Sequence, residues 1–297
     1  MERIEVNKDL SLSRIIQGFW RLSHWDNKPE DTLRFMEECL ELGITSFDNA
    51  DIYMAEELQG NAMKLNPTLR DKIEIITKCG IKPMNALFPE NKMLQYNSSK
   101  EHIVTCAENS LRRLGTDHID LLLIHRPDFI MDPEEIGEAF NELKKSGKVF
   151  NFGVSNFTSS QFSMLQSYVD VPLVTNQVEV SPLHLDPIAD GSFDFMLEKR
   201  IHPMAWSPLA GGRIFTGEDE RAVRLRGSLD RIKEEIGANS IDEVIYAWLL
   251  RHPVKIMPIV GSGKIERTKA AVNALQLNFT RDHWYEIWQS SLGRNID

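Results

Sequence analysis

An acid, a phenol, an ammonium and an imidazole follow three successive apolar runs of the chain. Asp48 and Tyr53 lie in FDNADIY, Lys78 ends IEIITK, and His125 ends IDLLLIH. A phenol has a reference pKa of about 10, which is too high for efficient proton transfer at neutral pH. The Lys78 ammonium would favour tyrosinate and lower the pKa of Tyr53, and Asp48 would keep Lys78 charged and oriented.

The imidazole completes a site for chemistry on a carbonyl group. His125 could position a carbonyl oxygen within reach of the Tyr53 hydroxyl, as general acid–base catalysis requires. Such a site can protonate an oxygen but supplies no hydride, so a redox cofactor is implied. Taken singly, each residue also has an ordinary structural explanation, as a turn residue, a packing ring, a lysine along a rim or a loop histidine. Convergence at one end of a fold is what favours the catalytic interpretation.

Short, almost continuously apolar runs alternate with amphipathic stretches along the chain. Strands without polar alternation are typical of a parallel sheet that is buried on both faces. Eight such strand–helix units favour a closed (β/α)₈ barrel of the α/β class over an open sheet with a second domain. The expected strands are residues 14–20, 43–48, 73–78, 119–125, 149–155, 173–179, 202–207 and 255–261. The expected helices lie near residues 30–42, 55–64, 99–114, 133–146 and 158–168.

Additions to the barrel are expected within one barrel domain over residues 1–297. The first dozen residues are predicted to form a hairpin that closes the bottom of the barrel, and the stretch 208–240 is long enough to carry an extra helix. LNFTRDHWYEIWQSSL, after residue 275, is predicted to form a helix outside the barrel. Its apolar face would carry Trp284, Ile287, Trp288 and Leu292.

Composition narrows the function classes. The 297 residues carry a net charge of -10 without a lysine or arginine cluster, which disfavours a nucleic-acid or anionic-membrane partner. No apolar stretch resembles a signal peptide or reaches the roughly 20 residues of a membrane span. Three cysteines in no metal-binding spacing favour a reduced, cytoplasmic protein without a metal site. We expect a monomer that acts on a small molecule.

Seven stretches occur in an order that is known from other proteins. FDNADIY, ITKCG, LLLIHRPD, FGVSNF, NQVEVSP, AWSPLAGG and IVGSGKIER resemble the signature stretches of the aldo-keto reductase family, over about residues 12–290. The resemblance implies a (β/α)₈ barrel that binds NADP(H) without a Rossmann domain. It also implies hydride transfer between the nicotinamide and the carbonyl carbon of a small substrate. The implied catalytic residues are Asp48, Tyr53, Lys78 and His125, with Tyr53 as the proton donor in reduction.

The resemblance also implies a series of contacts with NADPH or NADP⁺. Arg267 would take the 2′-phosphate, because guanidinium groups pair well with phosphate oxygens. A helix that begins near Lys264 would add its N-terminal dipole. Apart from the resemblance, two interpretations stay open for Trp20, Arg21 and Trp25, which follow the first strand: they wall the cofactor and substrate mouth, or they serve ordinary packing. The implied nicotinamide contacts are Ser155, Asn156, Gln177 and Trp206, the pyrophosphate contacts are Ser207, Pro208, Leu209 and Gly211, and the adenosine contacts are Gly261, Ser262, Gly263 and Arg267.

The chain departs from the family pattern in two places that concern binding. After Tyr53 it enters the next helix almost directly through Met54–Glu57, where the family commonly has a glycine-rich loop, and this bears on substrate scope. Ala270 and Ala271 stand where many relatives hold adenine with Glu and Asn. Three loop aromatics could line an apolar pocket: Phe88, Phe129 and Phe215.

Other functions are compatible with parts of the sequence. A cofactor-bound regulatory subunit, as among potassium-channel β-subunits, would share the fold, and a barrel hydrolase could use Asp48 and Glu179. Tyr96 and Lys100 form a YxxxK pattern of short-chain dehydrogenases, but the glycine-rich turn that those enzymes need after their first strand is absent. An NADPH-dependent carbonyl reductase accounts for the largest number of motifs.

Overall fold

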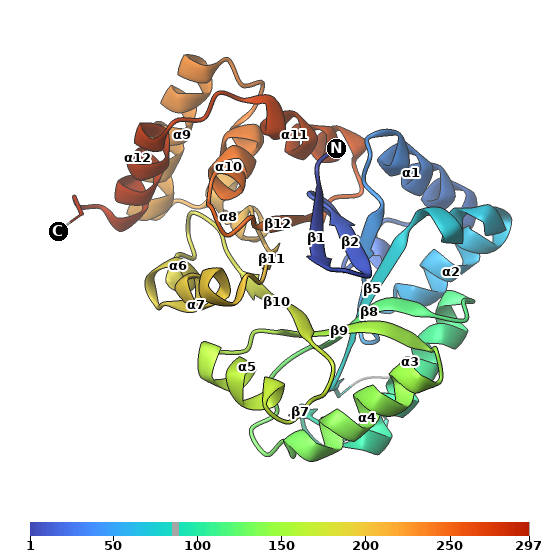
Figure 1. The fold of residues 1–297 in the computed structure, drawn as a ribbon. Coiled ribbons are helices and arrows are strands. Elements are labelled where there is room, and N and C mark those ends of the chain that lie inside the picture. The colour runs from blue at the N-terminus through green and yellow to red at the C-terminus, as the bar shows by residue number, and fades with distance from the viewer. Residues whose placement is uncertain (85–88, 297) are drawn as a thin grey trace.

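Eight parallel strands close into a barrel that is surrounded by helices (Figure 1). The computed structural model describes residues 1–84 and 89–296. Each barrel strand pairs with the next one along the chain, and the last pairs with the first, so the predicted (β/α)₈ barrel is confirmed. The barrel strands are β3 (Ile16–Gly18), β4 (Ser46–Asp48), β5 (Glu74–Cys79), β8 (Ile119–Ile124), β9 (Val149–Ser155), β10 (Leu173–Glu179), β11 (Met204–Trp206) and β12 (Met257–Val260).

Helices follow the strands and cover the outside of the barrel, and none in the described ranges is long and apolar enough to cross a membrane. The α-helices are α1 (Pro29–Glu41), α2 (Glu56–Leu65), α3 (Lys100–Leu114), α4 (Pro133–Lys145), α5 (Ser159–Gln166), α6 (Asp186–Ala189), α7 (Ser192–Lys199), α8 (Arg213–Thr216), α9 (Glu220–Ile236), α10 (Ile241–Leu250), α11 (Ile265–Asn273) and α12 (Arg281–Leu292). The 3₁₀ helices are η1 (Leu22–His24), η2 (Pro67–Lys72), η3 (Ala210–Gly212) and η4 (Ala274–Gln276).

Local signals set the ends of these helices, as α3 shows. The Ser99 side chain accepts a hydrogen bond from the His102 N–H at its start. Gly115 follows its last residue in the left-handed conformation, with φ at 64°. A serine N-cap and a glycine after the C-terminus are the residues that these two positions favour.

The barrel strands are apolar on both faces because both faces are buried. In β8, Leu121 and Leu123 belong to the cluster inside the barrel. The alternate residues Leu122 and Ile124 belong to the layer beneath α3 and α4. Since a strand turns successive side chains to opposite faces, this double burial explains the continuous apolar runs.

A hairpin of β1 (Arg3–Asn7) and β2 (Leu10–Ser13) closes one end of the barrel, in front in Figure 1. The Asn7 side chain shapes its turn by accepting two backbone hydrogen bonds, at 2.8 and 2.7 Å. Ile4 and Leu12 are buried in the cluster that fills the barrel interior. The predicted N-terminal hairpin is therefore present, and only the opposite end of the barrel is left for a site. A second small hairpin, β6 (Ile81–Lys82) with β7 (Gln95–Tyr96), follows β5.

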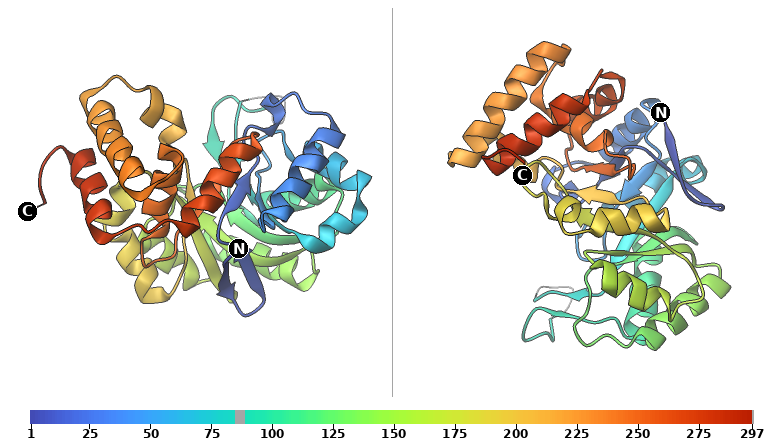
Figure 2. Two further views of the ribbon diagram at one scale, coloured as in Figure 1. Left: turned by 90° about the horizontal axis from the view of Figure 1, so that it is seen from above. Right: turned by 60° about the vertical axis from the view of Figure 1, so that its left-hand side comes forward.

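Helices α9 and α12 pack together at one side of the barrel (Figure 2). Both additions predicted from the sequence, in 208–240 and after residue 275, are therefore confirmed. Ile287 is fully buried, and the rings of Trp284 and Trp288 stack with centroids 5.4 Å apart. Leu292 was expected on the same buried face but is 40% exposed, because it is the last residue of the helix, where few neighbours remain.

Candidate active site

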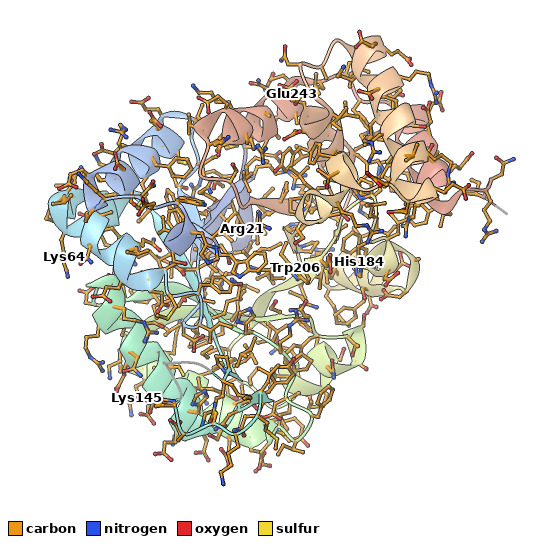
Figure 3. All side chains as sticks on the ribbon, turned by 180° about the vertical axis from the view of Figure 1, so that it is seen from behind. Arg21, Lys64, Lys145, His184, Trp206 and Glu243 are labelled. Atoms are coloured by element: carbon orange, nitrogen blue, oxygen red, sulfur yellow. The ribbon has the colours of Figure 1, made fainter. Side chains whose placement is uncertain are left out.

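The carboxyl ends of the strands surround a cavity of about 450 Å³. Figure 3 views the molecule from the side opposite the hairpin, where Arg21 and Trp206 lie near the middle and Lys64 and Lys145 on the outer helices. Of the residues predicted for catalysis, the cofactor or the mouth, Lys78, Gly263 and Trp25 are not on the described cavity wall. Those that line it are Trp20, Arg21, Asp48, Tyr53, His125, Ser155, Asn156, Gln177, Trp206, Ser207, Pro208, Leu209, Gly211, Gly261, Ser262 and Arg267.

Asp48 and Lys78 form a buried ion pair next to Tyr53. They lie on the neighbouring strands β4 and β5, and the Lys78 side chain is fully buried. Lys78 Nζ donates to Asp48 Oδ2 at 2.8 Å and to the Asn49 carbonyl at 2.6 Å. The same Nζ lies 5.0 Å from the centroid of the Tyr53 ring. The structure thus brings the predicted acid, ammonium and phenol together.

The Tyr53 hydroxyl faces an imidazole from the next strand. Tyr53 Oη and His125 Nε2 are 3.4 Å apart, and the two rings meet edge to face. His125 directly follows β8, where its N–H donates to the Cys79 carbonyl at 2.8 Å. The Trp20 ring lies on the cavity wall with its centroid 6.4 Å from that of Tyr53. All four predicted catalytic residues are therefore within one cluster.

The pKa of Tyr53 shifts in the direction opposite to the one expected. Burial is the largest cause and raises this pKa above its usual value. The charge of Lys78 and a hydrogen bond with it lower the pKa, but the Asp48 and Asp51 carboxylates raise it. The predicted net lowering is therefore wrong: the ammonium acts as expected, but desolvation of the phenolate outweighs it. Tyr53 keeps its proton at neutral pH.

The other two titratable groups have definite charge states. Burial alone would lower the pKa of Lys78, but the Asp48 charge, together with Tyr53, raises it, so Lys78 stays an ammonium. The pKa of His125 lies well below its usual value, because the ring is buried and faces the charges of Lys78 and Arg126. His125 is therefore a neutral imidazole, and its Nδ1 has no hydrogen-bond partner among the described residues.

A chain of hydrogen bonds links the catalytic cluster to the strand ends predicted to hold the nicotinamide. Gln177 Nε2 donates to Asp48 Oδ1 at 2.8 Å, and Ser155 Oγ donates to the Gln177 carbonyl at 2.8 Å. Asn156 Nδ2 donates to Ser155 Oγ at 2.8 Å, and Trp206 Nε1 donates to Asn156 Oδ1 at 3.0 Å. The Asp48 contact engages the Gln177 amide nitrogen, which leaves its carbonyl oxygen as the group able to accept from a carboxamide.

The loop after β11 lines the cavity with unusual backbone conformations. Ser207 and Ala210 have φ values of 49° and 51°, and Gly211 and Gly212 have values of 65° and 98°. The left-handed region is uncommon for residues with a side chain, so such conformations are typical of functional loops. Positions Gly211 and Gly212 have no other atoms within 4 Å of where a Cβ would lie. This open, N–H-rich segment suits the phosphates of a dinucleotide.

The far end of the cavity differs from the prediction at two positions, Gly263 and Trp25. Gly263 lies beside the cavity instead of lining it, because the Trp25 ring packs against it and a Cβ there would be 2.5 Å from that ring. Trp25 itself, expected at the mouth, is also absent from the described cavity wall. Arg267 is exposed on the wall, at the start of α11. Ala270 and Ala271 are buried on the same helix, so their side chains cannot replace the adenine contacts of other family members.

Several wall residues were missed by motif reasoning. Arg126 could have been found, because it directly follows His125; its guanidinium carbon lies 5.7 Å from the centroid of the Trp206 ring. Tyr246 carried no signal, because it comes from α10 and reaches the wall only through the packing of the barrel. The missed residues are Gly18, Ile52, Ile81, Arg126, Gly212, Tyr246 and Ile259.

The three loop aromatics have different outcomes. Phe215 lines the cavity, as expected. Phe129 is 87% exposed and does not belong to the wall. Phe88 lies outside the described residues.

Comparison with known proteins gives the same family along the whole chain. A model of the Aldo/keto reductase family matches residues 14–291. The chain is 50% identical to the uncharacterized oxidoreductase YcsN of Bacillus subtilis (strain 168), with 100% of both chains covered. It is 47% identical to the oxidoreductase YdhF of Escherichia coli (strain K12), over 96% of this chain and 95% of that one. It is 44% identical to a 6-dehydroglucose reductase of Agrobacterium fabrum, again with 100% of both covered.

A solved structure supports the fold. The thermostable aldo-keto reductase Tm1743, crystallised with the inhibitor epalrestat, has a TM-score of 0.82 and 24% identity, over 98% of this chain and 100% of that one. The family match and the full-length relatives agree with the resemblance seen in the seven motifs. The chain belongs to the aldo/keto reductase family.

Proposed function

We propose that this protein reduces aldehyde or ketone carbonyls to alcohols with NADPH and that Tyr53 donates the proton. The observation that carries this proposal is the Tyr53 hydroxyl on the cavity wall, 3.4 Å from His125 Nε2 and next to the buried Lys78–Asp48 pair. A phenol that keeps its proton at neutral pH is suited to protonate an oxygen on which negative charge develops. When bound, NADPH would supply the hydride that the carbonyl carbon receives.

Each residue of the cluster has its own role in this proposal. Tyr53 gives its proton to the carbonyl oxygen, and the positive charge of Lys78 stabilises the tyrosinate that remains. Asp48 keeps Lys78 charged and in place. The neutral His125 donates an N–H to the same oxygen and does not compete as an acid. We place that hydrogen on Nε2. Nδ1, which has no partner among the described residues, is then an unsatisfied acceptor, and buried unsatisfied acceptors are less rare in folded proteins than buried unsatisfied N–H groups.

The cavity walls fit NADPH in chemistry and in order. Ser155, Asn156 and Gln177 would hold the carboxamide, and the ring of Trp206 would lie against the nicotinamide. Backbone N–H groups of the loop after β11 would hold the pyrophosphate. Arg267 would pair with the 2′-phosphate and favour NADPH over NADH.

A small hydroxylated aldehyde is the substrate class that we propose first. The relative from Agrobacterium fabrum is named a 6-dehydroglucose reductase, which is an activity on a sugar carbonyl. The Trp20 ring and the Arg126 guanidinium line the same cavity as Tyr53. An aromatic face with nearby hydrogen-bond donors suits a ligand that has both C–H and hydroxyl groups. We propose that the protein acts on such a compound as a monomer.

The experiment follows NADPH absorbance with the purified protein and a reactive hydroxylated aldehyde such as glyceraldehyde. We expect turnover by the wild type and a loss of about 100-fold or more in Tyr53→Phe. NADPH should still quench tryptophan fluorescence in the variant, because Tyr53 is not among the residues proposed to hold the cofactor. Undiminished turnover in Tyr53→Phe would remove this residue as the proton donor. Tight NADPH binding without turnover of any aldehyde would favour a cofactor-bound sensing subunit instead.

A further inference from the structure

A buried carboxyl lies behind the catalytic cluster, and the proposed mechanism does not use it. Asp51 belongs to the turn that leads from β4 to Tyr53, and it is only 5% exposed. Neither of its carboxyl oxygens has a partner at normal hydrogen-bond geometry among the described residues, and only the weak Cys106 thiol donor and the Ile52 N–H lie close to it. Buried carboxylates are normally paired with a cation or accept hydrogen bonds, so this exception requires an explanation.

The cations near this carboxyl are bound to other acids. Arg113, on α3, pairs with Glu56 through Nη2 at 2.6 Å and Nε at 2.7 Å. Lys78 is paired with Asp48 at 2.8 Å. Among the described residues, Asp51 therefore has the acid Glu56 as a neighbour and no cation that is paired with it.

The remaining groups that face Asp51 are weak partners. They are the buried thiols of Cys79, on β5, and Cys106, on α3. Burial is the largest cause, and with the Glu56 charge it raises the pKa of Asp51 to about 7. The Cys106 thiol, the charge of Arg113 and a backbone N–H offset only part of this shift. An acid with this pKa changes its charge near neutral pH.

The backbone ties Asp51 to two members of the catalytic cluster. Its N–H donates to the Lys78 carbonyl at 3.0 Å. The Tyr53 N–H donates to the Ala50 carbonyl at 3.1 Å, so Asp51 and Tyr53 share one tight turn. Negative charge on Asp51 raises the pKa of Tyr53. The Tyr53 hydroxyl is therefore a stronger acid when Asp51 is neutral and a weaker acid when Asp51 is ionised.

We propose that Asp51 is a positioning residue for proton transfer: it carries a proton in the faster form of the enzyme and weakens Tyr53 as an acid when it ionises. This inference rests on the proposed reductase function, because it concerns the proton that Tyr53 donates. The Asp51 charge is the smallest of the causes that shift the pKa of Tyr53, so we take its effect as about one pKa unit, and proton-transfer rates follow all or part of such a shift. We therefore expect a rate change of about three- to tenfold.

The first test measures the single-turnover rate of carbonyl reduction by the NADPH-loaded enzyme between about pH 5.5 and 9. In the wild type the rate should fall by about three- to tenfold as the pH rises through about 7. In Asp51→Asn the fall should be absent, and above about pH 8 the variant should be faster than the wild type by the same factor. A wild-type rate that is constant across neutral pH, or a fall that persists in Asp51→Asn, would overturn the proposal.

Asp128→Asn is the matched control. Asp128, in the loop after β8, is also a buried carboxyl, at 8% exposed, but its oxygens accept hydrogen bonds from Ser98 and from the Ile130 N–H. Because this carboxyl is partnered, its replacement should leave the fall near pH 7 in place. If the fall of the rate near pH 7 were lost in Asp128→Asn as well, its loss in Asp51→Asn would reflect a general disturbance of the site, which would count against the role of Asp51.

The second test does not need turnover. In protein with ¹³C-labelled aspartate, the resonance of Asp51 is the one that is missing in Asp51→Asn. This resonance should titrate near pH 7, and if it titrates below about pH 5 instead, the proposal is overturned. If the wild type reduces no carbonyl compound, the proposed function fails. The electrostatic coupling between Asp51 and Tyr53 is then measured by tyrosinate absorbance as a function of pH. The signal of Tyr53 is the part that disappears in Tyr53→Phe. Tyr53 should ionise at lower pH in Asp51→Asn, and an unchanged value would overturn the coupling.

Discussion

The proposed catalytic cluster and the proposed cofactor groove adjoin one cavity but are built in different ways. Asp48, Lys78 and His125 lie at the ends of β4, β5 and β8 and are buried; Lys78 is paired with Asp48, and His125 contacts Tyr53. The groove after β11 and β12 is formed by backbone in strained conformations, by open glycines and by the exposed Arg267.

This difference matches two different requirements: rigid positioning of the groups that transfer a proton, and access for a cofactor that enters and leaves. Proton transfer needs groups at hydrogen-bonding distance, which buried strand ends supply at small entropic cost. A dinucleotide that must enter and leave is better held by loop backbone and surface charge. Substitutions in the catalytic cluster should therefore change the rate and the stability, whereas substitutions in the groove should change cofactor affinity alone.

The largest effect is expected from Lys78→Met. This change removes the ammonium beside Tyr53 and leaves the buried Asp48 carboxylate without its cation. We expect a loss of about 3–5 kcal/mol in the free energy of unfolding and a reduction rate lower by about 100-fold or more. Urea unfolding and single-turnover kinetics measure the two effects. Lys64→Met, at an exposed position on α2, should change neither; a Lys78→Met protein with wild-type stability would contradict the rigid description of the cluster.

Asp51→Asn should have the next largest effect. The variant should be more stable to unfolding than the wild type, relative to their difference at low pH, only at higher pH. The pKa of Asp51 is raised by burial from an ordinary 3.8 to about 7, so folding favours its protonated form. The stability of the wild type should therefore fall, relative to the variant, as the pH rises from about 4 through 7. Proton linkage predicts that the free energy of unfolding of the wild type, relative to that of the variant, falls by about 2–3 kcal/mol between pH 5 and 8. Urea midpoints at both pH values check this, and a constant difference would mean that Asp51 is ionised throughout.

Gly212→Val tests the groove through its backbone. Gly212 has a φ of 98°, and a Cβ there would meet nothing within 4 Å, so the cost is conformational and not steric contact with neighbours. We expect NADPH affinity to fall by about tenfold while the rate with saturating cofactor is nearly unchanged. Fluorescence titration measures the affinity. Gly227→Ala, in helix α9 and equally free of contacts, is the control and should leave both quantities unchanged.

The smallest effect is expected from Arg267→Met. An exposed guanidinium that pairs with one phosphate contributes only modestly, so NADPH affinity should fall by about three- to tenfold. NADH affinity should stay the same, because NADH lacks the 2′-phosphate. Lys269→Met, on the same helix and also exposed, should affect neither cofactor. Equal losses for both cofactors would mean that Arg267 does not read the 2′-phosphate.

Much of the architecture was predictable from local patterns. Apolar runs such as IDLLLIH marked strands that are buried on both faces, and their carboxyl ends brought Lys78 and His125 close to Tyr53. Contacts between residues of different helices, strands and loops were not predictable from local patterns. Gly263 is covered by Trp25, and Tyr246 reaches the cavity from a helix, because both contacts depend on how the elements pack.

The sequence by itself determined the barrel, its hairpin, the added helices and the order of polar residues at the strand ends, because periodicity and strand direction are properties of short segments. Only the tertiary structure decided the charge states. The pKa of Tyr53 rises instead of falling, Gln177 binds Asp48, and Asp51 is left without a paired cation in the part of the chain that the structure describes. These outcomes depend on burial and on charges summed over several strands and helices, and no single segment of the chain contains that sum.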